Sequence, residues 1–178
     1  GYTINTKRND SIADLEVIHH KGMPFLEEHL GPYRFRISPQ SFFQTNASQA
    51  EKLYEVVKQF AGLTGKETLY DLYSGTGSIG IYLSEGAKKI VGLEYVEQAT
   101  RDAAVNAGEN GIAQAVFYAG DLKDLLKPDL YEKEGRPDVI VADPPRSGIH
   151  ADVIEQIKQS GAHTLVYVSC NVATQARD

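Results

Sequence analysis

Residues 67–80 have the sequence ETLYDLYSGTGSIG, and this stretch decides the fold. An apolar strand leads directly into Gly75, Gly77 and Gly80, whose spacing G-x-G-x-x-G opens a helix. Glycines let a ligand approach the backbone closely, and the N-terminus of the helix then faces that ligand. The stretch therefore predicts a nucleotide-like cofactor at the end of a strand. The alternative is a tight turn that holds no ligand.

Strands and helices alternate from this loop to the end of the chain. Apolar strands are predicted at residues 67–73, 88–94, 115–120, 137–143 and 163–170, and helices at 78–85, 97–109, 122–126 and 151–159. This repeated β-α order is typical of a parallel sheet with helices on both faces. The polar segment KPDLYEKEGRP, residues 127–137, is predicted to be a surface loop.

The chain before residue 67 has a different pattern. Short alternating runs, YTINT (2–6), DLEVI (14–18) and YRFRIS (33–38), are separated by turn residues and predict small antiparallel strands. A helical stripe follows over residues 46–60, with Asn46 or Ser48 as its N-cap and Gly62 after its end. We expect a β-rich leader over residues 1–44 and an α/β domain over residues 45–178.

Composition excludes several classes of protein. The net charge of −6 argues against the broad basic surface of a self-sufficient nucleic-acid binder, so any RNA contact should be local or supplied from outside these residues. One cysteine excludes an internal disulfide, and five histidines without zinc-ligand spacing predict no metal site. No run approaches the ~18 apolar residues of a membrane helix, and no signal-peptide core is visible. These features predict a cytoplasmic protein.

Acidic residues follow two of the predicted strands. Glu94 ends the second strand about 20 residues after the glycine loop, where a carboxylate would accept hydrogen bonds from two ribose hydroxyls. Asp143 ends the fourth strand and is followed by two prolines, whose locked φ angles make a stiff rim over the cofactor's reactive end. The alternative for this second motif is a rigid loop without a ligand. The glycine loop and Glu94 suit a dinucleotide dehydrogenase and an S-adenosylmethionine enzyme equally.

Arg146 follows the two prolines. Methyltransferases that act on the amino groups of bases typically carry an aromatic residue there, which stacks on the base. The arginine argues against amino methylation, and it is free to contact a carbonyl or phosphate of the substrate.

Cys170 lies where the last apolar strand gives way to polar residues. A lone cysteine can be an inert, buried apolar residue. Here, however, residues 171–174 can start a helix whose N-terminal dipole would favour a thiolate. A thiolate at the mouth of the crevice can attack an electron-poor carbon of a pyrimidine ring and thereby activate the neighbouring carbon.

Four segments together resemble a known family: FRISPQSFFQTN (35–46), DLYSGTGSIG (71–80), DPPRSG (143–148) and YVSCNVATQARD (167–178). They are similar to the S-adenosylmethionine-dependent RNA (uracil-5-)methyltransferases, which modify ribosomal or transfer RNA. The resemblance runs from about residue 34 to 178. Cytosine-5 enzymes carry a further cysteine beside the fourth-strand proline, and its absence here favours uracil. The implied fold is a Rossmann-like class I methyltransferase sheet, truncated at its C-terminus, behind a small β-rich segment.

The resemblance also implies roles for single residues. Cys170 becomes the nucleophile that adds to carbon 6 of uracil, and Arg146 remains the substrate contact. S-adenosylmethionine is the implied cofactor, and its implied contacts are Gln44, Tyr73, Gly75, Glu94, Asp121 and Asp143. Of these, Asp121 would reach the adenine. Two contacts have simpler alternatives: Gln44 could be only a polar residue before a helix, and Tyr73 could serve only in packing.

The resemblance further implies an RNA partner, with ribosomal RNA favoured over transfer RNA. Family members place the general base, a glutamate, some thirty-odd residues beyond the cysteine. We therefore expect these 178 residues to bind cofactor without completing turnover. Lys7, Arg8, Arg34 and Arg36 could touch RNA, although charged residues on exposed strands are usually only solvated.

Two other functions remain open from the sequence. A dinucleotide-dependent oxidoreductase would account for the glycine loop and Glu94, but it leaves the segments around Asp143 and Cys170 unexplained. A non-catalytic fragment that holds a cofactor or docks RNA would account for an inert Cys170.

Overall fold

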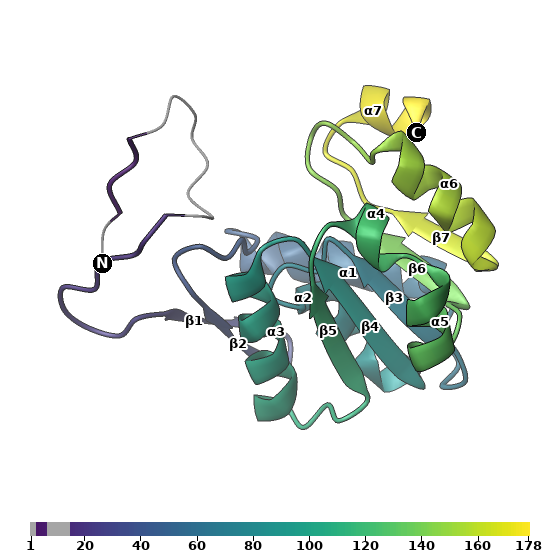
Figure 1. Ribbon diagram of the computed structural model, residues 1–178. Coiled ribbons are helices and arrows are strands. Elements are labelled where there is room, and N and C mark those ends of the chain that lie inside the picture. Colours follow the sequence, from purple (N-terminus) through teal and green to yellow (C-terminus); the bar gives the residue numbers. More distant parts are fainter. Residues whose placement is uncertain (1–2, 7–14) are drawn as a thin grey trace.

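The computed structural model describes residues 3–6 and 15–178, and its centre is a parallel sheet (Figure 1). Within these residues the sheet has the order β5-β4-β3-β6-β7, with every neighbouring pair parallel. The strands are β3 (Thr68–Leu72), β4 (Lys89–Glu94), β5 (Ala115–Ala119), β6 (Val139–Ala142) and β7 (Thr164–Tyr167). The chain runs outward from β3 to β5 and then returns to the other side of β3. The direction of winding therefore reverses between β3 and β6, which is where open parallel sheets bind ligands.

Side chains of each strand alternate between two apolar cores. In β3, Leu69 belongs to one core and Tyr70 to the other, and both are completely buried. The first core is covered by α1 (Ala47–Ala61), α2 (Ser78–Tyr82) and α3 (Glu97–Glu109), and the second by α4 (Leu122–Leu125), α5 (Pro128–Glu134) and α6 (Ala151–Ser160). A short 3-10 turn, η1 (Ser84–Gly86), follows α2, and α7 (Val172–Arg177) ends the chain. The predicted α/β fold is confirmed.

A small antiparallel hairpin extends the first core. It consists of β1 (Leu26–Leu30) and β2 (Tyr33–Ile37), and Leu30 and Phe35 are completely buried against α1 and its neighbours. Strand β2 was predicted, whereas β1 was missed. Of the other two predicted strands, residues 3–6 and 15–18 form no regular strand, and the remainder lies outside the described residues.

The segment 127–137 was wrongly predicted to be a surface loop. It contains helix α5, which begins with Pro128 at its first turn, where a proline needs no hydrogen-bond partner. Leu130 and Glu134, four residues apart, are both buried on the side that faces the sheet, and the ring of Tyr131 lies 6.2 Å from that of Tyr70. Two apolar residues among charged neighbours were enough to anchor a helix.

Helix α1 begins and ends as predicted. The side chain of Asn46 accepts a hydrogen bond from the backbone N–H of Gln49, which makes Asn46, not Ser48, the N-cap. Gly62 closes the helix with a left-handed φ of 57°. The predicted helix at 78–85 is shorter than expected, because α2 ends at Tyr82 and the chain tightens into η1.

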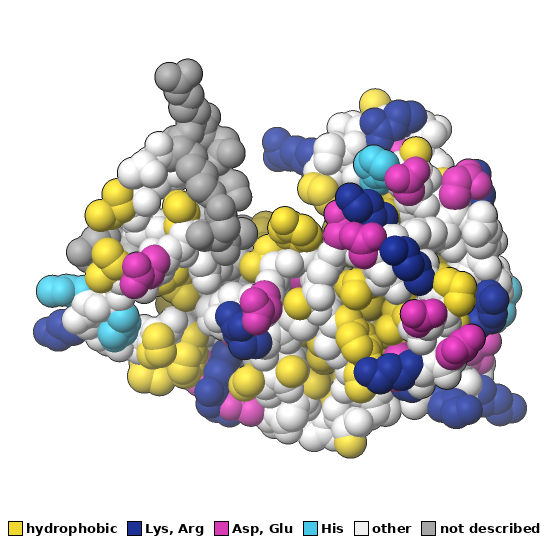
Figure 2. Space-filling model, in the orientation of Figure 1, with side chains coloured by type: hydrophobic (Ala, Val, Ile, Leu, Met, Phe, Trp, Pro, Cys, Tyr) yellow, Lys and Arg dark blue, Asp and Glu magenta, His cyan; other side chains and the backbone are white. Residues whose placement is uncertain are grey.

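The surface carries charges of both signs. On the side shown in Figure 2, outside the grey atoms, acidic and basic side chains alternate over α3, α4 and α5. Among the described residues, no helix is long and apolar enough to cross a membrane.

Candidate active site

All five strands end at one edge of the sheet, and the predicted site residues follow these ends. Tyr73 and Gly75 come after β3, Glu94 ends β4, Asp121 comes after β5, Asp143 after β6 and Cys170 after β7. Backbone hydrogen bonds continue the sheet into these loops: Ser74 N–H donates to Leu93, Gly120 N–H to Glu94 and Val168 N–H to Ala142. The structure thus brings the predicted residues to a common rim.

The glycine loop adopts a conformation that most residues avoid. Tyr73 has a φ of 61°, the only positive φ of a non-glycine residue in the described part of the chain, and Gly75 and Gly77 have φ of 54° and 78°. A Cβ on Gly77 would lie 3.0 Å from the ring of Phe117 and 3.1 Å from the Cβ of Ala103. A left-handed tyrosine is strained, and such strain is concentrated at ligand sites. No pattern in the sequence predicts the left-handed conformation of Tyr73.

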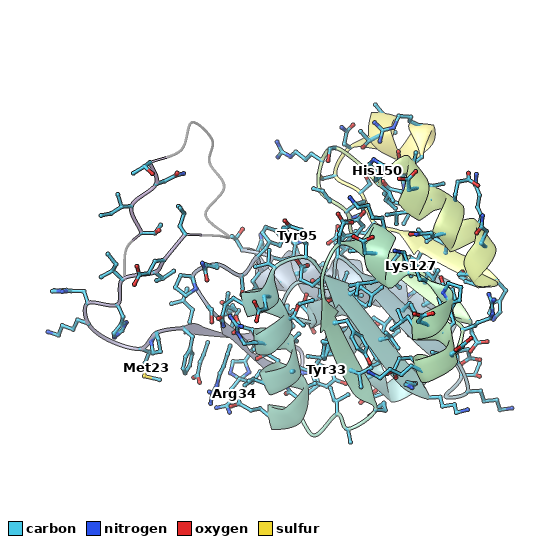
Figure 3. The ribbon with its side chains drawn as sticks, viewed as in Figure 1. Met23, Tyr33, Arg34, Tyr95, Lys127 and His150 are labelled. Carbon is cyan, nitrogen blue, oxygen red and sulfur yellow. The ribbon has the colours of Figure 1, made fainter. Side chains whose placement is uncertain are left out.

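Glu94 is held by the glycine loop itself. Its Oε2 accepts a hydrogen bond from Gly75 N–H at 3.0 Å, and its Oε1 accepts one from Val96 N–H at 2.8 Å. Each carboxylate oxygen keeps a second acceptor position, so the oriented carboxylate can still receive two hydroxyl groups. Tyr95 is 70% exposed, and Figure 3 places it at the same edge of the sheet.

Gln44 and Asp143 meet although they are far apart in sequence. The amide of Gln44 donates a hydrogen bond to the Asp143 carboxylate, which lowers the pKa of that carboxyl, while burial has the larger, opposite effect and leaves the pKa raised to about 6. The loop before α1 therefore reaches the end of β6, and Gln44 lies within the site. A contact between Gln44 and the cofactor stays a prediction.

Asp71 is a site residue that the sequence did not single out. It is completely buried in β3, its Oδ2 accepts from Gly80 N–H at 2.8 Å, and its Oδ1 has no partner among the described residues. Burial raises the pKa of Asp71 to about 7, and the negative charges of Asp143 and Glu94 add to this rise. A lone carboxyl inside the apolar run LYDLY was the available signal.

Tyr73 and Asp121 flank the glycine loop. Tyr73 is half-buried, and burial, with a contribution from the nearby Asp121 charge, raises its pKa to about 12. Asp121 is the N-cap of α4, where it accepts from Lys123 N–H at 3.1 Å, and Lys123 Nζ lies 3.2 Å from its other oxygen. Its carboxylate therefore already has partners within its own helix.

Cys170 is exposed, not buried. It stands in the loop between β7 and α7, directly before Asn171, whose side chain accepts from Ala173 N–H and caps the helix. The interpretation of Cys170 as a buried apolar residue is therefore wrong. A solvent-facing thiol between the end of a parallel strand and a helix start is accessible to a substrate.

The loop that carries Arg146 is fastened to α7. Asn171 Nδ2 donates to the Arg146 carbonyl at 3.2 Å, Arg177 Nη2 donates to the Ser147 carbonyl at 2.9 Å, and Ile149 N–H donates to an Asp178 carboxylate oxygen at 2.7 Å. The Arg146 side chain itself is exposed. Cys170 and Arg146 thus lie in two loops that are joined by hydrogen bonds.

Comparison with known proteins identifies the family. A family model described as a methyltransferase domain matches residues 63–177. The chain belongs to this methyltransferase family. This match gives no support to the dinucleotide-dependent oxidoreductase that the glycine loop and Glu94 left open.

Curated relatives of this methyltransferase carry more specific names. An uncharacterized RNA methyltransferase of Bacteroides thetaiotaomicron is 51% identical over 177 residues, and one of Clostridium acetobutylicum is 42% identical over 175 residues. These alignments cover 99% and 98% of the chain but only 39% and 38% of the relatives' own lengths. The chain therefore spans less than half of the curated relatives that it matches.

A solved structure supports the same placement. The tRNA (uracil-54, C5)-methyltransferase of Pyrococcus abyssi, determined in complex with S-adenosyl-L-homocysteine, superimposes with a TM-score of 0.80 at 32% identity. The match covers 99% of this chain and 41% of that protein.

Proposed function

We propose that this protein transfers a methyl group from S-adenosylmethionine to carbon 5 of a uridine in RNA, through a covalent bond between Cys170 and carbon 6. The observation that carries the proposal is an exposed Cys170 in the loop after β7, the strand that pairs with β6, whose end Asp143 follows; the glycine loop lies at the same rim. The names of the relatives support RNA as the substrate, and the segments shared with uracil-5 enzymes support the position on the base.

The residues at the rim fit S-adenosylmethionine. The glycine loop offers a close approach to the backbone, and the oriented carboxylate of Glu94 suits two ribose hydroxyls. Asp71 is a buried carboxyl and Asp143 a partly buried one, both with raised pKa values, and a positively charged ligand nearby would relieve their unfavourable charge. The unpartnered Oδ1 of Asp71 is the strongest sign of such a ligand. When bound, S-adenosylmethionine supplies an electrophilic methyl group on a sulfonium.

The remaining residues would divide the work between the two ligands. Gln44 holds Asp143, and Tyr73 and Asp121 flank the glycine loop on the side of β5. We assign cofactor binding to residues 45–178 together with Gln44 from the leader. Arg146, exposed beside the Cys170 loop, would contact a carbonyl or phosphate of the RNA.

Cys170 would act in three steps, after the uridine has been flipped from its stack. Its thiolate adds to carbon 6, which forms a carbon–sulfur bond and makes carbon 5 an enolate-like nucleophile. Carbon 5 then takes the methyl group as the bond between methyl and sulfonium breaks. A base removes the proton from carbon 5, the double bond re-forms, and the thiolate leaves. We expect this base outside the residues assigned here, and we expect the protein to act in the cytoplasm because its substrate is RNA.

The experiment that tests the proposal traps the covalent bond. The full-length protein is incubated with S-adenosylmethionine and RNA containing 5-fluorouridine. In this RNA fluorine replaces the hydrogen on carbon 5, so the base has no proton to remove and the covalent adduct accumulates. Mass spectrometry should find a methylated adduct on Cys170 and none in Cys170→Ala. Ribosomal and transfer RNA are tested in separate arms. A protein that binds S-adenosylhomocysteine and methylates unmodified RNA without forming any adduct would refute the covalent route.

A further inference from the structure

One face of α3 carries a row of polar residues that meets strand β2. Asp102, Asn106 and Asn110 are spaced by four residues, so their side chains project from the same side of the helix. Asn106 is completely buried and Asp102 is 7% exposed. Polar side chains that are this deeply buried are costly unless their hydrogen bonds are satisfied, and here they are.

The row pairs with the backbone of β2 as a neighbouring strand would. Asn110 accepts from Arg34 N–H at 3.0 Å and donates to the Arg34 carbonyl at 2.7 Å. Asn106 accepts from Arg36 N–H at 2.7 Å and donates to the Arg36 carbonyl at 3.1 Å. Two strand residues span about 6.6 Å and four helical residues about 6 Å, so the two periods match. In Figure 3, Arg34 lies beside the C-terminal end of α3, at the far end of the row.

The row reaches into the site at its other end. Asp102 accepts from Ser38 N–H at 2.8 Å, from Ser38 Oγ at 2.8 Å and from Ser41 Oγ at 2.7 Å. These bonds fix the start of the loop that ends in Gln44, which donates to Asp143. Asp102 is therefore connected to the cofactor rim through the loop that it anchors.

Asn106 provides a second connection to the rim. Besides its bonds to Arg36, its Nδ2 donates to the carbonyl of Thr76 at 3.1 Å, inside the glycine loop. One side chain thereby joins β2, α3 and the glycine loop. Asn110 makes the same kind of bonds to Arg34 but contacts neither the glycine loop nor the loop of residues 38–44 in any bond described.

We propose that Asp102 and Asn106 are positioning residues for the cofactor. They hold the leader against α3 so that Gln44 meets Asp143 and the glycine loop keeps its shape. The inference rests on the proposed function. It adds that the leader, residues 1–44, forms one side of the cofactor site through Gln44. If the row served only stability, its distal member Asn110 would matter for the cofactor as much as Asp102 does.

The test is a double-mutant cycle on affinity for S-adenosylhomocysteine, measured by calorimetry on the 178-residue chain. Asp102→Asn keeps the size of the side chain and should weaken binding about tenfold, because a charged acceptor of four hydrogen bonds, one of them from Gln98, is lost. Gln44→Ala should weaken binding to a similar degree. The double variant should be little weaker than the worse single variant, because Asp102 acts through the placement of Gln44.

Asn110→Ala is the matched control, since it removes the same kind of bonds at the distal end. It should lower the melting temperature but leave the affinity within about threefold. Ser41→Ala is a milder second variant, which removes one donor to Asp102 and should weaken binding by a smaller factor. Hydrogen exchange without ligand should be faster at residues 38–44 in Asp102→Asn and faster only near Arg34 in Asn110→Ala.

Two results would overturn the inference. The first is a loss of affinity in the double variant that equals the product of the losses in Asp102→Asn and Gln44→Ala. The second is an equal loss of affinity in Asp102→Asn and Asn110→Ala. Failure of the proposed function gives a different result: the 5-fluorouridine experiment then finds no adduct on Cys170, whereas the affinities for S-adenosylhomocysteine and their dependence on Asp102 can still be measured.

Discussion

Asp71 shows how one buried carboxyl links the fold to the site. It is completely buried in β3, and burial raises its pKa to about 7. The folded protein therefore keeps a proton there over a range in which the unfolded chain, with an ordinary carboxyl pKa of 3.8, has released it. A group of this kind makes folding less favourable as the pH rises from about 4 to about 7.

Asp71→Asn should remove this dependence on pH. The amide has the same size and can still accept from Gly80 N–H, but it cannot ionise. We expect the variant to melt at a higher temperature than the parent at pH 8, with a difference that shrinks steadily toward pH 5. Thermal melts followed by circular dichroism between pH 5 and pH 8 measure this difference in melting temperature. Glu132→Gln, at an exposed position of α5, is the control. A difference that stays constant over the whole range would contradict the raised pKa.

At the scale of an element, the sequence offered two possible N-caps for helix α1, Asn46 and Ser48. Asn46 caps the helix through its side chain, whereas Ser48 lies within the first turn. Asn46→Ala should lower the free energy of unfolding by about 1 kcal/mol. Ser48→Ala should change it by less than about 0.5 kcal/mol. Urea denaturation of both variants measures the difference, and equal losses would show that the cap is assigned to the wrong residue.

The elements also show what local sequence can predict. Strands β3 to β7 were predicted because short apolar runs alternate with helical stretches along the chain, and this pattern requires no knowledge of distant contacts. Helix α5 was missed because only Leu130 and Tyr131 stand among its charges, and their partner Tyr70 is far away in sequence. Asp102 and Asn106 were not singled out, because nothing in the local sequence shows that they are buried. Their hydrogen-bond partners lie in β2 and in the loop after it, about sixty to seventy positions earlier.

At the scale of the whole molecule, charge distribution limits how the chain can meet RNA. The net charge is −6, and Arg34 and Arg36, two candidates for RNA contact, both form ion pairs with Glu109. The other two candidates, Lys7 and Arg8, lie outside the described residues. Exposed arginines that already have a carboxylate partner gain little from a phosphate, so these two side chains add little to RNA affinity.

We therefore expect the 178-residue chain to bind RNA weakly and with a shallow dependence on salt. The logarithm of the binding constant should fall with the logarithm of salt concentration with a slope corresponding to fewer than about three phosphate contacts. Fluorescence anisotropy between low and high salt measures the slope, and the full-length protein provides the comparison. A slope as steep for the chain as for the full-length protein would show that these residues carry the whole electrostatic footprint.

The hydrogen bonds from α7 to the Arg146 loop have a consequence for substrate entry. Asn171, Arg177 and Asp178 tie residues 146–149 to the segment that begins with Cys170. These hydrogen bonds hold the loop that carries Cys170 and the loop that carries Arg146 in a fixed relative position. Under the proposed function, the base at Cys170 and the phosphate at Arg146 are bound at a fixed separation, so the RNA must present both groups together.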